Sequence, residues 1–173
     1  MNTDASPAAA RITARPRLLI PVGIPGSGKS NWAMSLDITD RQMISSDAIR
    51  LRLTGSLQAA NQPARQAMLN ELVFTIFNCE IRESLASGKT VIADATNLRP
   101  ESREQLLSIA EATGAEAYAF LFDDLDRARI QNRKRAEDAV VPEAVIDEMT
   151  GLYLQAKAEI ENDRRYTSVS YVS

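Results

Sequence analysis

The amino-acid sequence predicts an α/β fold, with a parallel sheet of about five strands and helices on both faces. Short apolar runs alternate with helical patterns along the chain. Each polar stretch of chemical interest directly follows one of the apolar runs. Because right-handed crossovers place the carboxyl ends of all strands at one edge of such a sheet, we expect the ligands to bind at that edge.

The first part of the chain predicts two strands and two short helices. RLLIPV (17–22) is an apolar run that ends at a glycine, so we expect a buried strand, and SNWAMSLD (30–37) follows as a short helix. RQMISS (41–46) predicts a second short strand. DAIRLRLTG (47–55) predicts one or two helical turns that end at Gly55.

The longest helix is predicted over residues 64–88, where apolar residues recur at helical spacing and Gly88 ends the pattern. We expect its apolar stripe to lie in the core and Cys79 to be a buried, unreactive thiol. The stripe consists of Met68, Leu72, Ile76 and Cys79, widened by Val73, Phe77 and Ile81.

The second half of the chain continues the alternation. KTVIADAT (89–96) and AEAYAFLF (115–122) predict strands. Between them, residues 100–114 predict a helix with Pro100 in its first turn and Gly114 after its end. A basic helix, a proline-started helix and a last strand follow over residues 124–136, 142–163 and 166–172.

Composition restricts the class of protein. With 173 residues, 45 % of them apolar, the chain has the size of one domain with its own core. Residues 1–16 lack apolar periodicity, so we expect a flexible tail followed by a single domain over 17–173. No run is apolar enough for a signal peptide or a membrane span, and we expect a cytoplasmic protein without a membrane partner.

Histidine and cysteine usage restricts the chemistry. The sequence contains no histidine and one cysteine, which excludes Ser–His and Cys–His catalysis, the usual zinc sites and an internal disulfide. A general base must therefore be a carboxylate or a lysine. The net charge of −3 argues against coating of nucleic acid by bulk attraction, but it permits a local basic groove.

GIPGSGKS (23–30) matches the phosphate-binding P-loop pattern G-x-x-x-x-G-K-[ST] at every fixed position, between a predicted strand and a predicted helix. Glycines let the loop wrap so that its N–H groups point at phosphate oxygens. In such a loop the lysine, Lys29, reaches the β- and γ-phosphates, and the hydroxyl of Ser30 ligates Mg²⁺. The sequence therefore predicts a P-loop NTPase whose nucleotide-binding residues are Gly26, Ser27, Gly28, Lys29 and Ser30.

A second polar stretch, ISSDAIR, follows the next predicted strand. Its Asp47 lies at the same sheet edge as the P-loop, where a carboxylate can accept the proton of an attacking hydroxyl. Arg50 lies one helical turn further, on the same face, and can hold an anionic substrate group. The alternative is that Asp47 only caps the following helix, and spacing alone favours neither reading.

At this point the chain resembles a known family, the kinase domain of the polynucleotide 5′-kinases, which are P-loop enzymes of bacteriophage and bacterial nucleic-acid repair. The resemblance spans about residues 17–153 and consists of four blocks in the right order. The blocks are GIPGSGKSNWA, ISSDAIRLRLTG, VIADATNLRPESR and QNRKR with VVPEAVIDEM. This resemblance implies ATP as the phosphate donor, Mg²⁺ as the metal, and a 5′-hydroxyl end of RNA or DNA as the acceptor.

The resemblance also implies roles for individual residues. Asp47 would be the general base that activates the 5′-hydroxyl, and Arg50 would bind the phosphate on the 3′ side of the acceptor nucleotide. Arg135, with Arg133 as its neighbour, would lie in a lid over the β- and γ-phosphates. One departure is Gln131, which stands where such proteins often have an arginine, so we expect fewer contacts from the lid.

VIADATN places another carboxylate, Asp94, at a strand end, where it can hold Mg²⁺ through water. Thr96 and Asn97 follow and can contact the acceptor strand, although all three are also ordinary turn residues. Arg99 and Arg103 can line the acceptor groove, although solvated helix arginines are more common.

RARIQNRKR (127–135) carries five positive charges and no negative one. Charge runs are usually solvated surfaces. This run follows a strand and precedes a proline-started helix, which is where P-loop kinases carry a lid that excludes water and stabilises the transferring phosphoryl group. We therefore expect an arginine-rich lid.

Three functions are compatible with these features. The first is an ATP-dependent polynucleotide 5′-hydroxyl kinase that needs no obligate protein partner. The second is a P-loop kinase of a small hydroxylated molecule, such as a sugar, an antibiotic or a nucleotide sugar, and the third is a nucleotide-binding switch or ATPase subunit. The arginines at 50, 99 and 103 favour the first, because they suit a phosphodiester and not a neutral sugar.

Overall fold

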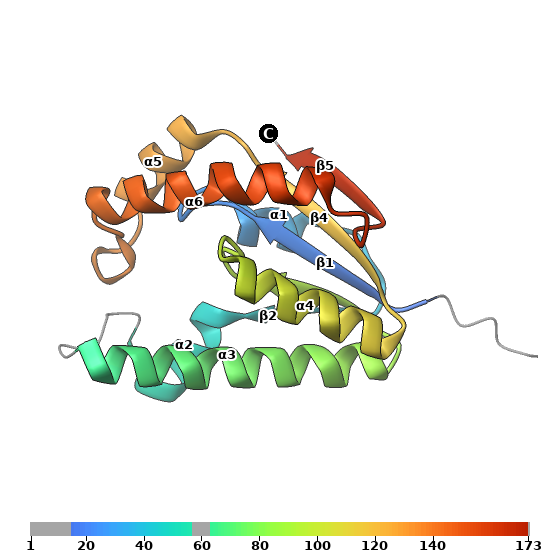
Figure 1. Ribbon diagram of the computed structural model, residues 1–173. Coiled ribbons are helices and arrows are strands. Elements are labelled where there is room, and N and C mark those ends of the chain that lie inside the picture. The colour runs from blue at the N-terminus through green and yellow to red at the C-terminus, as the bar shows by residue number, and fades with distance from the viewer. Residues whose placement is uncertain (1–14, 57–62, 173) are drawn as a thin grey trace, which may run out of the picture.

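The computed structural model describes residues 15–56 and 63–172 (Figure 1). Residues 1–14 of the expected tail therefore lie outside the described part of the chain. The elements are β1 (Arg17–Val22), α1 (Lys29–Ser35), β2 (Arg41–Ser45), α2 (Ser46–Thr54), α3 (Pro63–Ala86), β3 (Thr90–Asp94), α4 (Pro100–Thr113), β4 (Glu116–Phe122), α5 (Leu125–Arg133), the 3₁₀ turn η1 (Glu137–Ala139), α6 (Glu143–Asn162) and β5 (Ser168–Val172). Each predicted strand and helix is confirmed, with only small shifts at its ends.

The five strands form one sheet in the order β2-β3-β1-β4-β5, and every pair of neighbours is parallel. The parallel α/β fold is thus confirmed. β1, the strand before the P-loop, lies in the centre, with β3 on one side and β4 on the other. Its residues 18–22 are all buried, as expected for a strand that is covered on both faces.

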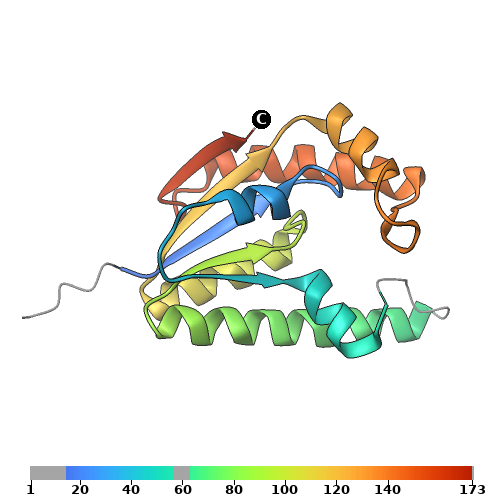
Figure 2. The same ribbon diagram turned by 180° about the vertical axis from the view of Figure 1, so that it is seen from behind.

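Helices cover the two faces of the sheet unequally. Figure 1 shows α3, α4 and α6 across one face, and Figure 2 shows α1 on the other. Alternation along β1 follows this division: Leu18 and Ile20 pack in the large core cluster, whereas Leu19 packs with Ala33 of α1 and Ile92 of β3. The side-chain period of two thus divides one apolar run between two cores.

The buried face of α3 differs from the predicted stripe. Its core residues are Val73, Phe77, Ile81 and Leu85, at a regular spacing of four and each at most 1 % exposed. Three residues of the predicted stripe are instead exposed: Met68 at 71 %, Leu72 at 48 %, and Cys79. The prediction of a buried Cys79 was therefore wrong. Several apolar stripes run along this helix, and only the packing of α3 on the sheet decided which one faces the core.

The start of α2 excludes the reading in which Asp47 only caps the helix. The N-cap of α2 is Ser45, whose hydroxyl oxygen accepts a hydrogen bond from the backbone N–H of Ala48 at 3.4 Å. Asp47 lies inside the first helical turn, so its carboxylate does not cap the helix. At the other end Gly55 adopts φ +71° and closes α2 as predicted. Within the described residues, no helix combines the length and apolar character needed to cross a membrane.

Candidate active site

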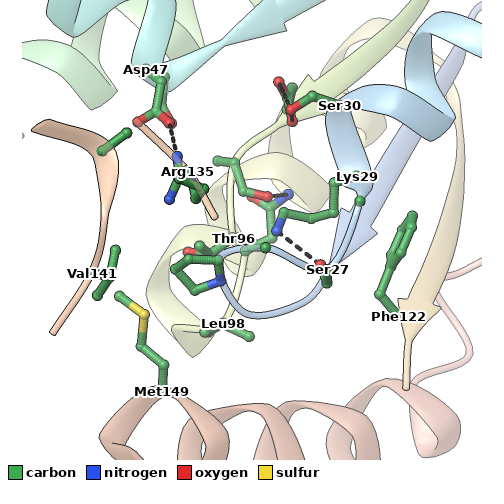
Figure 3. A pocket seen from close by; sticks show the side chains of 18 of the residues that line it. Ser27, Lys29, Ser30, Asp47, Thr96, Leu98, Phe122, Arg135, Val141 and Met149 are labelled. Carbon is green, nitrogen blue, oxygen red and sulfur yellow. Dashed lines mark hydrogen bonds and ion pairs between the residues drawn. The ribbon is translucent and has the colours of Figure 1, made fainter. Parts of the chain in front are cut away.

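A cleft of about 1380 Å³ lies at the carboxyl edge of the sheet, where the binding site was expected (Figure 3). Residues from all four sequence blocks line it: the P-loop, the start of α2, the loop after β3, and the chain after β4. Among the predicted site residues, those that line it are Gly26, Ser27, Gly28, Lys29, Ser30, Asp47, Arg50, Asp94, Thr96, Asn97, Arg99 and Arg135.

The P-loop conformation requires glycine at two positions. Gly26 and Gly28 have φ values of +82° and +90°, in the left-handed region that side chains rarely adopt. A Cβ atom on Gly26 would also collide with the backbone oxygen of Ala128 and lie 2.6 Å from the backbone nitrogen of Asn132. Both of these residues belong to α5. The P-loop therefore packs directly against the helix that begins the lid.

Lys29 lies at the centre of the P-loop and is only 8 % exposed. Its ammonium donates hydrogen bonds to the carbonyls of Gly23 and Ile24, both at 2.9 Å, and to the hydroxyl of Ser27 at 3.2 Å. Burial lowers the pKa of Lys29 to about 8. The charges of Asp94 and Asp47 oppose this shift, whereas that of Arg135 adds to it. The charges of the side chains expected to perform the chemistry thus influence the protonation of Lys29.

The side-chain oxygens of Ser30 and Asp94 are suitable ligands for Mg²⁺. The hydroxyl of Ser30 donates to the two carboxylate oxygens of Asp94 at 3.2 and 3.0 Å, because β1 and β3 are neighbours in the sheet. Mg²⁺ prefers a small number of such oxygen ligands, completed by substrate phosphates and water. No group of three or more His, Cys, Asp or Glu residues in the described chain provides another metal site. The donor set therefore fits the expected Mg²⁺.

Asp47 and Arg135 approach each other from opposite sides of the cleft (Figure 3). A nitrogen of the Arg135 guanidinium lies 3.7 Å from a carboxylate oxygen of Asp47. Arg135 comes from the loop after α5, and Asp47 from the first turn of α2. The lid segment thus reaches across the cleft to the residue expected to act as the base.

Arg133 does not lie where it was expected. Its side chain is 65 % exposed, pairs with Glu143 at 3.4 Å and is absent from the cleft lining, so the structure gives it no contact with the nucleotide site. Arg127, Gln131 and Lys134 line the cleft instead. The helical spacing of four between residues 127 and 131 is a sequence signal that would have identified this face of α5.

Arg50 reaches from α2 toward α3. One guanidinium nitrogen, Nη2, donates to the side-chain oxygen of Asn70 at 2.8 Å, while Nη1 is buried without a hydrogen-bond partner in the described part of the chain. Asn70 and Phe74 of α3 also line the cleft. Sequence reasoning missed both, because the predicted role of this helix was core packing and no motif marks its polar side.

The loop after β3 contains residues of two kinds. Thr96 and Arg99 line the cleft, and the carbonyl of Thr96 accepts a hydrogen bond from the N–H of Gly23 at 3.2 Å. Asn97 adopts φ +52° and is 3 % exposed. Its amide nitrogen donates to the carbonyls of residues 21, 93 and 95. The amide nitrogen of Asn97 therefore ties the ends of β1 and β3 together, while its side-chain oxygen has no hydrogen-bond partner among the described residues and the expected contact with the acceptor stays a prediction.

Arg103 was expected in the acceptor groove but lies outside the cleft. It is 4 % exposed, donates to the carbonyls of Asn97 and Leu98, and pairs with Glu159 of α6. The prediction that Arg103 binds substrate was wrong. Its position in the first turn of α4 turns the side chain back toward the preceding loop, away from the cleft.

Comparison with known proteins supports the fold. Residues 18–155 match the model of a family described as AAA domain. A chain in the structure of the Pnkp1/Rnl/Hen1 RNA repair complex superposes with a TM-score of 0.71 at 24 % identity, over 88 % of this chain and 48 % of that one. A chain in another structure of the Pnkp1/Rnl/Hen1 complex gives 0.54 at 25 %, over 73 % and 41 %. No curated protein matches.

The chain spans less than half the length of either solved chain. Both solved chains come from assemblies of three named components, so they give no support to the expectation that a protein partner is unnecessary. The matches do support the resemblance to a P-loop domain of the polynucleotide kinase type. Because the family model covers well over half of the sequence, the chain belongs to the AAA domain family.

Proposed function

We propose that this protein is an ATP-dependent kinase that transfers the γ-phosphate to the 5′-hydroxyl end of RNA or DNA in nucleic-acid repair. The observation that carries the proposal is the position of Asp47. Its carboxylate does not cap the helix, and Asp47 lines the cleft. A carboxylate oxygen of Asp47 lies 3.7 Å from a guanidinium nitrogen of Arg135. A hydroxyl bound beside Asp47 would therefore lie in the same cleft as the phosphates of a nucleotide bound by the P-loop.

In the proposed reaction Asp47 accepts the proton of the acceptor hydroxyl. The hydroxyl oxygen forms a bond to the γ-phosphorus while the bond between that phosphorus and the oxygen bridging to the β-phosphate breaks. Lys29 and Arg135 spread the negative charge that moves onto the leaving oxygen. Mg²⁺, held by Ser30 and Asp94, would supply charge neutralisation at the β- and γ-phosphates.

An anionic acceptor is supported by the cations on the acceptor side. Arg50 has a buried nitrogen without a partner, and the exposed side chain of Arg99 lines the same cleft. A neutral sugar would offer this guanidinium only uncharged hydroxyl acceptors, whereas a phosphate would form a stronger, charge-assisted hydrogen bond. The RNA repair complex that contains the first matched chain also supports a nucleic-acid acceptor.

The test is transfer of labelled γ-phosphate from ATP, with Mg²⁺, to a 5′-hydroxyl RNA and to a DNA of the same sequence. We expect Asp47→Ala to lower kcat by about 10² to 10⁴, as for loss of a general base, while ATP still protects the variant from thermal unfolding. Asp126→Ala is the matched control, because Asp126 is also exposed and also lies in the first turn of a helix, but is outside the cleft.

Two results would overturn the proposal. Undiminished transfer by Asp47→Ala would remove Asp47 from the mechanism. Absence of transfer to both oligonucleotides by a wild-type protein that binds ATP would point to the second candidate, a kinase of a small hydroxylated molecule.

A further inference from the structure

The side chain of Arg50 is fixed by residues that no motif includes. Its Nη2 donates to the side-chain oxygen of Asn70 at 2.8 Å. The same oxygen accepts a second hydrogen bond, at 3.0 Å, from the side-chain nitrogen of Gln66, one turn earlier on α3. Both lone pairs of the Asn70 oxygen are therefore engaged, and its amide is held in one orientation. Asn70 in turn restricts the guanidinium of Arg50 to one position.

The other terminal nitrogen of Arg50, Nη1, is buried and has no hydrogen-bond partner among residues 15–56 and 63–172. Arg50 also forms no ion pair with any carboxylate in the described residues, including Asp47 on the same helix. Arginine stays charged at any accessible pH, so it cannot remove the unpaired N–H donor by losing a proton. A buried cationic donor of this kind is stabilised by an anionic oxygen acceptor, and both Arg50 and Asn70 line the cleft.

The spacing of Arg50 and Asp47 along α2 limits what the acceptor can be. Asp47 and Arg50 are three residues apart on α2, so their side chains leave the same face one helical turn apart. In a nucleotide, the 5′-hydroxyl and the 3′-phosphate lie on opposite sides of a single sugar, which is a comparable separation. This spacing agrees with the role that the family resemblance implies for Arg50, contact with the phosphate on the 3′ side of an acceptor nucleotide whose 5′-hydroxyl lies at Asp47.

We propose that Asn70 is a positioning residue of the acceptor site, which aims the free nitrogen of Arg50 at the phosphate that follows the acceptor nucleoside. This inference rests on the proposed function. It assigns recognition of the acceptor to two helices: α2 supplies the base and the cation, and α3 fixes the cation. Asn70 acts through Arg50 and does not take part in the chemical step.

The experiment compares Asn70→Ala and Asn70→Asp with the wild type, using a 5′-hydroxyl oligonucleotide, cytidine 3′-monophosphate and cytidine as acceptors. Asn70→Ala frees the guanidinium, so we expect the KM of both phosphate-bearing acceptors to rise about tenfold while kcat stays within threefold. The KM of cytidine, which lacks the phosphate, should not change. Asn70→Asp keeps both hydrogen bonds but pairs the still-charged Arg50 with a carboxylate, which would compete with the acceptor phosphate, so we expect at least the same rise in KM.

The control variant is Asn78→Ala. Asn78 lies on the same helix and is also hydrogen-bonded, to Gln105 at 2.7 Å, but it is outside the cleft. We expect its KM values to equal those of the wild type. An unchanged KM in Asn70→Ala, or an equal rise with and without the 3′-phosphate, would overturn the inference, because the second result indicates only a structural role.

A binding measurement keeps this inference separate from the proposed function. Cytidine 3′-monophosphate should protect the wild type from thermal unfolding more strongly than it protects Asn70→Ala, whether or not transfer occurs. If the wild type fails to phosphorylate any nucleic-acid acceptor, the proposed function fails. If protection is equal in the two proteins, the inference about Asn70 fails.

Discussion

At the scale of single residues, Lys29 lies at the candidate nucleotide site although burial of its positive charge is unfavourable. Its ammonium is held by two carbonyls and a hydroxyl, yet burial still lowers its pKa from 10.5 to about 8. Folding therefore disfavours the protonated form of this lysine. A bound polyphosphate would supply the negative charge that the site lacks, so we expect ATP to raise the pKa again.

The lowered pKa predicts a pH dependence of stability. Below pH 8 Lys29 is charged in both folded and unfolded protein, and the destabilisation by its burial is fully present. Between pH 8 and pH 10.5 only the unfolded state keeps the proton, so this destabilisation is lost as the pH rises. We expect the free energy of unfolding of the wild type to rise relative to that of Lys29→Met by on the order of 3 kcal/mol over this range.

Urea unfolding of both proteins at several pH values measures this difference, and other titrating groups cancel in the comparison. Lys89→Met is the control, because Lys89 is exposed and its ammonium bonds only to Gln42 among the described residues. A difference between wild type and Lys29→Met that stays constant from pH 7 to pH 10.5 would contradict the burial of a charged Lys29.

At the scale of elements, α5 and the loop after it form the lid. Asn132, in the last turn of α5, is 1 % exposed, and both ends of its amide bond to the backbone of Val141. The distances are 2.8 Å to the carbonyl and 3.1 Å from the N–H. The segment that carries Arg135 is thus closed into a loop whose two ends are joined by one side chain.

The lid is also joined to α6. Arg129 bonds to Glu143 at 2.6 Å, Asp147 at 2.7 Å and Thr150 at 3.1 Å, all on α6. The hydrogen bonds to Asp147 and Glu143 raise the pKa of Arg129. The position of Arg135 near Asp47 therefore depends on contacts made by the opposite face of α5, outside the cleft.

We predict that Asn132→Ala weakens both the fold and the nucleotide site. Loss of the buried amide leaves the backbone groups of Val141 unpaired and should lower the free energy of unfolding by about 1–3 kcal/mol. It also frees the loop that carries Arg135, so we expect the KM for ATP to rise while Asp47 stays in place. Urea unfolding and steady-state kinetics measure the two effects.

Asn162→Ala serves as the control for this prediction, since Asn162 bonds only to its own helix and is exposed. If Asn132→Ala had the stability and kinetics of that control, the lid loop would not depend on this amide.

At the scale of the whole molecule, the strand order divides the site into three parts. The P-loop follows the central strand β1, the proposed metal ligand Asp94 and the proposed base Asp47 follow β3 and β2 on one side, and the proposed lid follows β4 on the other. A half-buried ion pair, between Arg103 of α4 and Glu159 of α6, connects the expected acceptor side to the helix that follows the lid segment. This pair therefore links the two halves of the sheet's helical cover.

We predict that this ion pair contributes measurably to stability. Arg103 is 5 % exposed in its side chain and Glu159 is 42 % exposed, so solvent screens the pair only from one side. A double-mutant cycle with Arg103→Met and Glu159→Gln should give a coupling free energy on the order of 1–2 kcal/mol.

The control cycle uses Arg165 and Glu104, a pair at 2.8 Å whose side chains are 51 % and 58 % exposed. Exposed pairs of this kind contribute below about 1 kcal/mol. Equal coupling free energies in the two cycles would show that burial of Arg103 does not strengthen its ion pair with Glu159.

The sequence alone determined the type and order of the strands and helices, the parallel sheet and the P-loop. These features depend on local patterns: apolar periods, glycines and prolines at the ends of helices, and the spacing of GIPGSGKS. It also placed Asp47 and Asp94 at the binding edge, because parallel strands all end there.

Only the tertiary structure decided which of these side chains meet. The order β2-β3-β1 brings Asp94 beside Ser30, and no local pattern encodes which strands become neighbours. Arg103 and Arg133, which the sequence predicted in the site, lie outside the cleft, whereas Asn70, which it did not predict, lines it. The physical reason is that the direction of a long side chain depends on the partners that packing provides, and those partners are distant in the sequence.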